Sequence, residues 1–168
     1  MERKKHLFLT GHKRVGKSTV LKKLLANHPE VAGGFRTLRV PCEGGCSVHM
    51  LSPEETECTA ENQIFRKHSG RLYLDIGDFD RIGCDLLKKS EGCPLILMDE
   101  LGPTEADALS FRGAVWKTLD DAERVYGVLQ MAESDFLEQV AARADVQVVT
   151  VTEGNRDDLP RLLAEQGW

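Results

Sequence analysis

The stretch "GHKRVGKST" contains the first residues whose types and spacing could do chemistry. Gly11, Gly16, Lys17 and Ser18 fit the pattern G-x-x-x-x-G-K-[ST]. In a glycine-rich turn of this kind, consecutive backbone N–H groups bind phosphate oxygens, and the helix that follows adds a partial positive charge. The lysine reaches the β- and γ-phosphates, and the hydroxyl after it binds a magnesium ion. The pattern therefore predicts a nucleotide phosphate site that holds Mg²⁺.

The predicted nucleotide-binding loop also includes the positions that the pattern leaves variable. Its members are Gly11, His12, Lys13, Arg14, Val15, Gly16, Lys17, Ser18 and Thr19. Two interpretations are open for the side chains of Lys13 and Arg14: they contact phosphates, or they point into solvent. We favour solvent, because the backbone of such a loop already binds the phosphates.

A second motif, "PLILMDE" at 94–100, is an apolar run that ends in two acids. A buried parallel strand of this type brings the residue after it to the carboxyl edge of the sheet, where nucleotides bind. Asp99 is therefore predicted to bind Mg²⁺ together with Ser18. The alternative is a strand that simply ends in a polar residue.

Glu100 follows the predicted magnesium ligand directly. A carboxylate at this place can orient and deprotonate a water molecule that faces the γ-phosphate, which is the work of a general base. A phosphotransferase has less use for such a base and more need of an acceptor pocket. Glu100 therefore favours hydrolysis, and the alternative is an exposed glutamate at the start of a loop.

Strands and helices alternate along the chain and must position these residues. Apolar runs and alternation predict strands at 6–10, 33–40, 47–51, 62–68, 71–76, 94–98, 125–130 and 146–152. Helical spacing predicts helices at 16–28, 77–92, 104–123, 133–145 and 156–167. The helix at 104–123 is expected to bury Leu109, Val115, Trp116 and Leu119 on one face.

This alternation predicts one α/β domain over residues 1–168, a three-layer phosphate-loop fold. We expect a mainly parallel sheet with helices on both faces. A β-hairpin insert near 35–69, with a connection of four to six residues around 41–46, interrupts the alternation.

Composition excludes several classes of protein. The 168 residues are 41% apolar and carry a net charge of −5, so a dedicated nucleic-acid binder is not expected. No run approaches the length of a membrane span, and the apolar part of the N-terminal segment, residues 7–9, is too short for an export signal. We predict a cytoplasmic protein that binds a nucleoside triphosphate but neither nucleic acid nor membrane. No feature identifies a protein partner.

Five cysteines raise the question of a second metal site. Cys42, Cys46 and Cys58 could bind zinc together with His49 or His68. The three-residue spacing in "CEGGC" differs from the usual zinc pairs, and no matching second pair exists. We favour reduced, free thiols. A disulfide between Cys42 and Cys46 is a further alternative.

Four segments occur together in an informative order: "GHKRVGKST", "GGFRT", "LILMDELGPTE" followed by Phe111, and "VTVTEGNRDDLPRLL". They resemble the nucleoside-triphosphatase family first described from thermophiles, also called cancer-related nucleoside-triphosphatases, over nearly the whole chain. The resemblance implies a phosphate-loop enzyme of the additional-strand, catalytic-glutamate type. It also implies slow, magnesium-dependent hydrolysis of ATP, GTP and other nucleoside triphosphates to the diphosphate and phosphate.

The resemblance carries specific residues over to this chain. The family's phosphate loop falls on residues 11–19, its acid pair on Asp99 and Glu100, and its "NRD" on 155–157. Within that last motif, Arg156 is a candidate catalytic cation for the charge of the transition state. The alternatives are an ion pair with a neighbouring aspartate, Asp157 or Asp158, or a contact with the base.

The chain departs from the family pattern in two places. The family often has acidic residues after its "GF-x-T" segment, where this chain has Leu38 and Arg39, and an apolar or proline-bearing loop where this chain has residues 12–14. These departures leave substrate preference open. Arg36 is a further candidate cation.

A kinase and a nucleotide-binding adaptor are the two alternatives to hydrolysis. A nucleotide or small-molecule kinase of this size needs an arginine-rich lid between its later strands, and residues 129–145 contain one arginine and no lid-sized insertion. A nucleotide-binding adaptor in cofactor maturation shares the loop. A GTPase switch usually has the guanine-reading motif N-K-x-D, which "EGNRDD" does not match.

Overall fold

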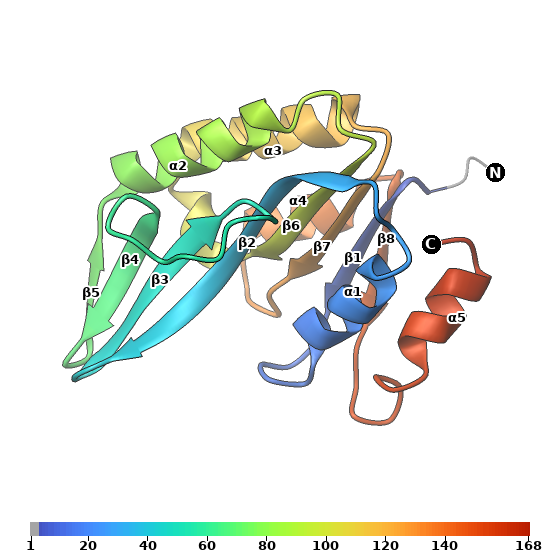
Figure 1. Cartoon of the computed structure of the whole chain (residues 1–168), viewed down its shortest axis with the longest axis horizontal. Coiled ribbons are helices and arrows are strands. Elements are labelled where there is room, and N and C mark those ends of the chain that lie inside the picture. The colour runs from blue at the N-terminus through green and yellow to red at the C-terminus, as the bar shows by residue number, and fades with distance from the viewer. Residues whose placement is uncertain (1–3) are drawn as a thin grey trace.

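The apolar runs of the sequence form one sheet of eight strands in the order β5-β4-β3-β2-β6-β7-β1-β8 (Figure 1). The computed structural model describes residues 4–168, so residues 1–3 of the N-terminal segment lie outside the described residues. The strands are β1 His6–Thr10, β2 Val31–Cys42, β3 Gly45–Leu51, β4 Gln63–His68, β5 Arg71–Leu74, β6 Leu95–Leu101, β7 Val125–Leu129 and β8 Val146–Thr150.

Helices connect the strands of the parallel part of the sheet. They are α1 Lys17–Leu25, α2 Ile76–Lys89, the 3₁₀ helix η1 Pro103–Ala106, α3 Leu109–Asp121, α4 Asp135–Ala141 and α5 Leu159–Glu165. The neighbouring strands β2, β6, β7, β1 and β8 all pair in parallel. Their carboxyl ends therefore meet at one edge, as the sequence predicts. No helix within residues 4–168 is both long enough and apolar enough to cross a membrane.

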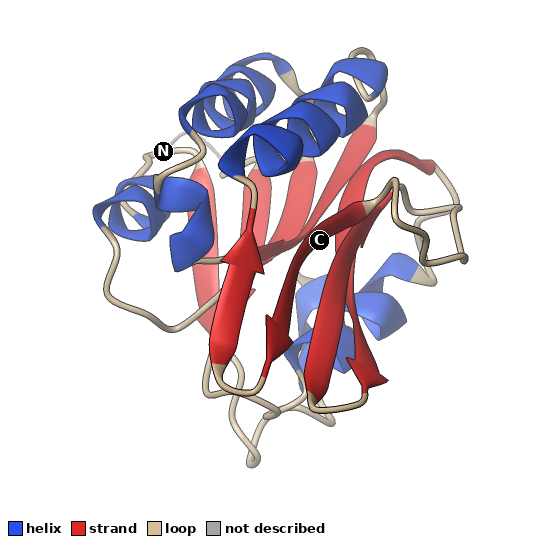
Figure 2. Cartoon of the chain, turned by 90° about the vertical axis from the view of Figure 1, so that its left-hand side faces the viewer, coloured by secondary structure: helices blue, strands red, loops and turns tan. Residues whose placement is uncertain are grey.

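Both faces of the sheet are covered, which confirms the three-layer α/β fold (Figure 2). Side chains alternate between the faces of a strand. In β1, Phe8 packs in the core beneath α2, α3 and α4, whereas Leu7 and Leu9 pack in the core beneath α1 and α5. The segment 6–10 shows no alternation of polar and apolar residues, because the strand is buried on both of its faces.

The expected hairpin insert is larger than predicted, because it forms an antiparallel wing of β2, β3, β4 and β5. Its first turn contains only residues 43 and 44, not the four to six residues expected. The turn from β4 to β5 contains Ser69 and Gly70, both with positive φ. Two-residue turns of this kind join antiparallel strands, so β5 adds to the wing and not to the parallel sheet.

The predicted helix at 104–123 is in fact two pieces, η1 and α3, and the expectation for Leu109 is wrong. Leu109 is 71% exposed, whereas Phe111 is fully buried against Phe35. The backbone N–H of Phe111 donates to Asp80 Oδ1 at 2.8 Å. Since Asp80 belongs to α2, the start of α3 is set by a partner that the local sequence does not reveal.

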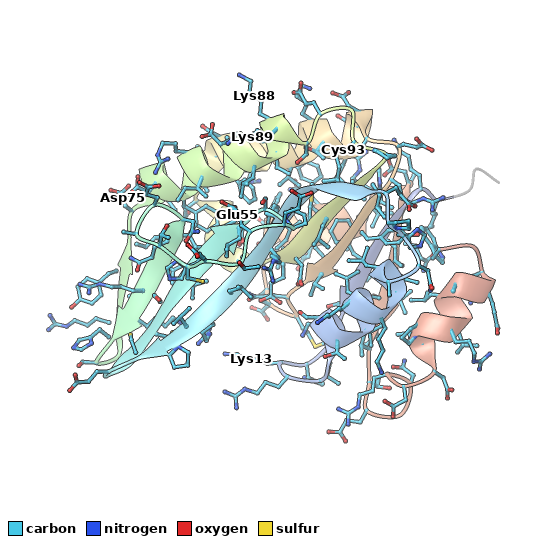
Figure 3. The ribbon with its side chains drawn as sticks, viewed as in Figure 1. Lys13, Glu55, Asp75, Lys88, Lys89 and Cys93 are labelled. Carbon is cyan, nitrogen blue, oxygen red and sulfur yellow. The ribbon has the colours of Figure 1, made fainter. Side chains whose placement is uncertain are left out.

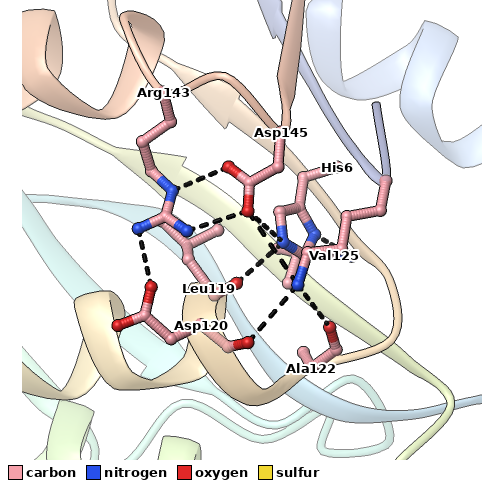
Figure 4. Close-up of polar contacts among 8 residues, drawn as sticks. His6, Leu119, Asp120, Ala122, Val125, Arg143 and Asp145 are labelled. Carbon is pink, nitrogen blue, oxygen red and sulfur yellow. Dashed lines mark hydrogen bonds and ion pairs between the residues drawn. The ribbon is translucent and has the colours of Figure 1, made fainter. Parts of the chain in front are cut away.

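A buried histidine fixes the start of β1 (Figure 4). His6 is fully buried; its Nδ1 accepts from the backbone N–H of Val125 at 3.0 Å, and its Nε2 donates to the carbonyl oxygen of Leu119 at 2.9 Å. Burial lowers the pKa of His6. The neutral ring thus ties β1 to β7 and α3, at the edge of the sheet opposite the phosphate loop.

Candidate active site

The loop after β1 has the strained backbone that a phosphate cradle needs. Gly11, Arg14 and Gly16 have φ values of 144°, 64° and 110°. A Cβ atom on Gly11 would lie 2.5 Å from the carbonyl oxygen of Val151. The loop therefore lies tightly against the end of β8, and only glycine fits at its first position.

Lys17 lies underneath this loop. Its side chain is 9% exposed, and its Nζ donates to the carbonyl oxygens of Gly11 at 2.8 Å and His12 at 3.0 Å. The side chains of His12, Lys13 and Arg14 are exposed, and Lys13 projects away from the protein (Figure 3). Lys17 therefore lies within the loop, whereas Lys13 lies in solvent.

Ser18 and Asp99 come together from α1 and β6. Ser18 Oγ donates to Asp99 Oδ1 at 3.3 Å. Asp99 lies next to Arg36 of β2 in the parallel ladder. A hydroxyl and a carboxylate are hard oxygen donors of the kind that Mg²⁺ prefers, and the ion takes its other ligands from water and substrate phosphates. The two residues therefore fit a magnesium site.

The carboxyl group of Asp99 is costly to ionise without a cation. Burial, and next the charge of Glu100, raise the pKa of Asp99 to about 6. The hydrogen bond from Ser18 and the charges of Arg36 and Lys17 act in the opposite direction. An additional positive charge at Asp99 would therefore be stabilised.

Glu100 has a partner that the sequence analysis missed. Gln130 Nε2 donates to Glu100 Oε1 at 2.6 Å. Gln130 follows β7, which lies between β6 and β1. A polar residue directly after a buried apolar strand was the signal that identified Asp99, and the same signal after residues 125–129 could have found Gln130.

Glu105 is a second acid that the sequence analysis did not single out. Its side chain is 5% exposed, and its Oε2 accepts from the backbone N–H of Gly102 at 2.8 Å. Burial raises the pKa of Glu105 to about 8, with a contribution from Glu100. Glu105 is therefore neutral at pH 7 and stabilises the turn that follows Glu100. No local sequence signal distinguishes it from an exposed helix-start glutamate.

A pocket of about 210 Å³ opens beside these groups. Ser18, Asp99 and Glu100 line one side of it, together with Glu105 and Gln130. The antiparallel wing lines the other side, with Arg39 of β2 and apolar residues of β3 and β4. The acids therefore meet in a partly enclosed pocket, which both polar and apolar residues line.

The "NRD" segment lies on the other side of the phosphate loop. Arg156 Nη1 donates to the carbonyl oxygen of Val15 at 3.3 Å, and no ion pair joins Arg156 to Asp157 or Asp158 within the described residues. Asn155 fixes this turn, because its Oδ1 accepts from the N–H of Thr152 and its Nδ2 donates to the carbonyl oxygen of Thr150. Because β8 is separated from β6 by two strands, Arg156 approaches the loop from the side away from Asp99.

The cysteines of the wing do not form a metal site. Cys46 pairs with Pro41, and Cys42 with Gly45, in the β2–β3 ladder, so the two thiols point to opposite faces. Both ring nitrogens of His49 have partners, Asn62 and Ser47. Over residues 4–168 no three side chains of His, Cys, Asp or Glu gather as a metal site would require.

A second cavity, of about 600 Å³, lies between the end of α2 and α3. It is lined by Cys84, Cys93 and Ile96, the last of which lies near the amino end of β6. Since nucleotides bind at the carboxyl edge of such a sheet, this cavity is remote from the predicted phosphate site.

Comparison with known proteins agrees with this geometry. A family model described as NTPase matches residues 6–164. Nucleoside-triphosphatase THEP1 of Methanosarcina acetivorans is 33% identical over 165 residues, which cover 94% of each chain. A cancer-related nucleoside-triphosphatase homolog of Bos taurus is 26% identical and covers 92% of each chain.

The fold is also similar to that of solved structures. The crystal structure of THEP1 from the hyperthermophile Aquifex aeolicus superposes with a TM-score of 0.77 at 18% identity, covering 96% of this chain and 98% of that one. The solution structure of a human cancer-related nucleoside triphosphatase gives a TM-score of 0.66 at 23% identity, covering 97% of each.

Proposed function

Because this chain belongs to the nucleoside-triphosphatase family, we propose that it hydrolyses ATP, GTP and other nucleoside triphosphates to the diphosphate and phosphate in a Mg²⁺-dependent reaction. One observation carries the proposal: Ser18, in the first turn of the helix after the phosphate loop, contacts Asp99, and Glu100 follows Asp99 directly. A phosphate cradle, two oxygen ligands and a carboxylate base are thereby gathered at one edge of the sheet.

Substrate binding is assigned to the loop. The backbone N–H groups at the start of α1 have no side-chain cap, and they are available to bind phosphate oxygens. Lys17 exchanges its two carbonyl partners for phosphate oxygens when the nucleotide enters. Ser18 and Asp99 would hold Mg²⁺, which would supply positive charge against the substrate phosphates.

Glu100 is assigned the role of general base. It accepts a proton from a water molecule whose oxygen forms a bond to the γ-phosphorus. The bond between that phosphorus and the bridging oxygen breaks, and the nucleoside diphosphate leaves with the electron pair. Gln130 positions Glu100, because its amide donates to one carboxylate oxygen and leaves the other to face the water.

Arg156 keeps two proposed roles. Its contact with the phosphate loop supports a part in nucleotide binding, either at the transition state or at the base and ribose. Its approach from the side of β8 favours the second role. The cytoplasmic location, the single domain over residues 1–168 and the absence of a nucleic-acid partner stay predictions.

The test is phosphate release by the purified protein with Mg–ATP, Mg–GTP and Mg–CTP and no acceptor present. We expect release from each, and loss of release when EDTA removes the metal. Phosphate transfer that requires an added nucleoside monophosphate or other acceptor would favour the kinase alternative. Nucleotide binding without release would favour an adaptor.

A further inference from the structure

Arg39 is the one basic residue among the described residues that line the pocket beside Glu100. A pocket of about 210 Å³ is equivalent to a sphere about 7 Å across, which is about the reach of an arginine side chain. Arg39 and Glu100 therefore face a common space. Ser18 and Asp99 line this space too, so with Mg²⁺ bound there as proposed above, the γ-phosphate would be the part of the nucleotide nearest to it.

The strand register explains how Arg39 reaches this place. Pairing between β2 and β6 ends at Arg36 and Asp99, and β2 continues to Cys42. Arg39 thus lies three residues, or about 10 Å, beyond Asp99 along the strand direction. Its backbone therefore lies beyond the end of the β2–β6 pairing, at the carboxyl edge of the parallel strands. Arg39 pairs with Val48, a residue of the same pocket wall, so both side chains lie on one face of the wing.

The guanidinium of Arg39 is free, whereas those of Arg36 and Arg156, the two candidate cations outside the phosphate loop, are held. Over residues 4–168, the Arg39 side chain is exposed and makes no hydrogen bond, ion pair or ring contact. Arg36 donates through Nη2 to the carbonyl oxygen of Glu55, and Arg156 donates to the phosphate loop from the side of β8. An unpaired guanidinium at the wall of a pocket is available to bind an anion that enters the pocket.

We propose that Arg39 is a catalytic residue that binds the γ-phosphate and stabilises the charge that develops on it during hydrolysis, so that this chain supplies its own arginine from the β2–β3 wing. The proposal rests on the proposed function. It assigns a role to a position where the sequence departs from the acidic residues often found in the family. Arg39 makes no contact with the diphosphate product.

The experiment compares Arg39→Ala and Arg39→Lys with a control, Arg71→Ala. Arg71 is an exposed arginine of β5 that lines none of the site. We expect Arg39→Ala to lower kcat for Mg–ATP and Mg–GTP roughly 10²-fold and Arg39→Lys to lower it less. Free guanidinium should restore part of the loss in Arg39→Ala. Arg71→Ala should behave as the unmodified chain.

Binding separates a γ-phosphate contact from a structural effect. By calorimetry, Arg39→Ala should bind ADP within about twofold of the unmodified chain, and should bind AMP-PNP and ADP–aluminium fluoride at least about tenfold more weakly. An unchanged kcat, or an equal loss of affinity for ADP and AMP-PNP, would overturn the proposal.

The design also separates failure of the inference from failure of the proposed function. If the unmodified chain releases phosphate and Arg39→Ala does so equally well, only the role of Arg39 is wrong. If the unmodified chain binds nucleotides but releases no phosphate, hydrolysis is wrong, and the ratio of AMP-PNP to ADP affinity still decides the Arg39 contact. If it binds neither nucleotide, both are overturned.

Discussion

Ser18 Oγ lies 3.3 Å from Asp99 Oδ1, although 81 positions separate the two residues in the sequence. Ser18 lies in the first turn of α1, after the phosphate loop, and Asp99 lies near the end of β6. The contact joins the phosphate-binding half of the site to its acidic half. All the assigned steps of hydrolysis depend on this junction, so its components give the clearest tests.

Asp99→Asn tests the proposed magnesium ligand. An amide oxygen carries no negative charge, so hydrolysis of Mg–ATP should fall on the order of 10²-fold and should need more Mg²⁺ for half-maximal rate. The measurement is phosphate release across a Mg²⁺ titration. Asp107→Asn, at an exposed position outside the site, serves as the control. An unaltered Mg²⁺ requirement in Asp99→Asn would remove Asp99 from the ligand set.

Lys17→Ala tests the buried lysine of the loop. Because Lys17 is the ammonium directed into the loop, the variant should bind ATP on the order of 10²-fold more weakly and lose hydrolysis. Lys13→Ala is the matched control, since Lys13 is exposed and projects into solvent. Equal losses of ATP affinity in the two variants, measured by calorimetry, would contradict the distinction drawn between them.

Glu100→Gln tests the general base. The amide keeps an acceptor for Gln130 but cannot take a proton, so kcat should fall roughly 10³-fold while ATP affinity changes little. Single-turnover phosphate release and equilibrium binding measure the two quantities. Glu123→Gln, at an exposed glutamate before β7, should change neither kcat nor ATP affinity. Full turnover by Glu100→Gln would require another base.

Gln130→Ala tests the positioning of that base. Loss of the 2.6 Å hydrogen bond frees the Glu100 carboxylate to rotate, so kcat should fall about tenfold with little change in KM. Gln147→Ala, on β8, is the control. An unchanged kcat in Gln130→Ala would show that Gln130 does not position Glu100.

Glu105→Gln tests the buried neutral acid through stability. Its pKa in the folded protein, about 8, lies above its ordinary value of 4.5, so the folded state keeps a proton that the unfolded state loses. Stability of the unmodified chain should therefore fall as pH rises from about 4.5 to 8. Glu105→Gln stays neutral and should remove that part of the fall, roughly a few kcal/mol.

Urea denaturation at pH 5, 6.5 and 8 measures this effect. The stability of Glu105→Gln relative to the unmodified chain should rise steadily across the series. Glu105→Ala supplies the comparison: it leaves the buried N–H of Gly102 without its acceptor, so it should be less stable than Glu105→Gln at each pH. A constant difference between Glu105→Gln and the unmodified chain would mean that Glu105 is ionised in the folded state.

Much of the fold could be predicted from local sequence patterns, and each wrong prediction has an identifiable cause. Strands such as 6–10 and 94–98 are buried on both sides, so their apolar runs are unambiguous. The start of α3 was misplaced because Asp80, on another helix, binds the N–H of Phe111. The wing was underestimated because a two-residue turn at 69–70 reverses the chain.

The sequence by itself determined which residues could bind phosphate and metal, because a glycine-rich loop and an acid after an apolar strand are local patterns with local physical causes. Only the tertiary structure decided which side chains share the site. Gln130 reaches Glu100 because β7 lies beside β6, and Arg39 faces the same pocket because β2 extends past its neighbour. Such proximity depends on strand order and register, which are set by packing across the whole chain and leave no mark at the residues themselves.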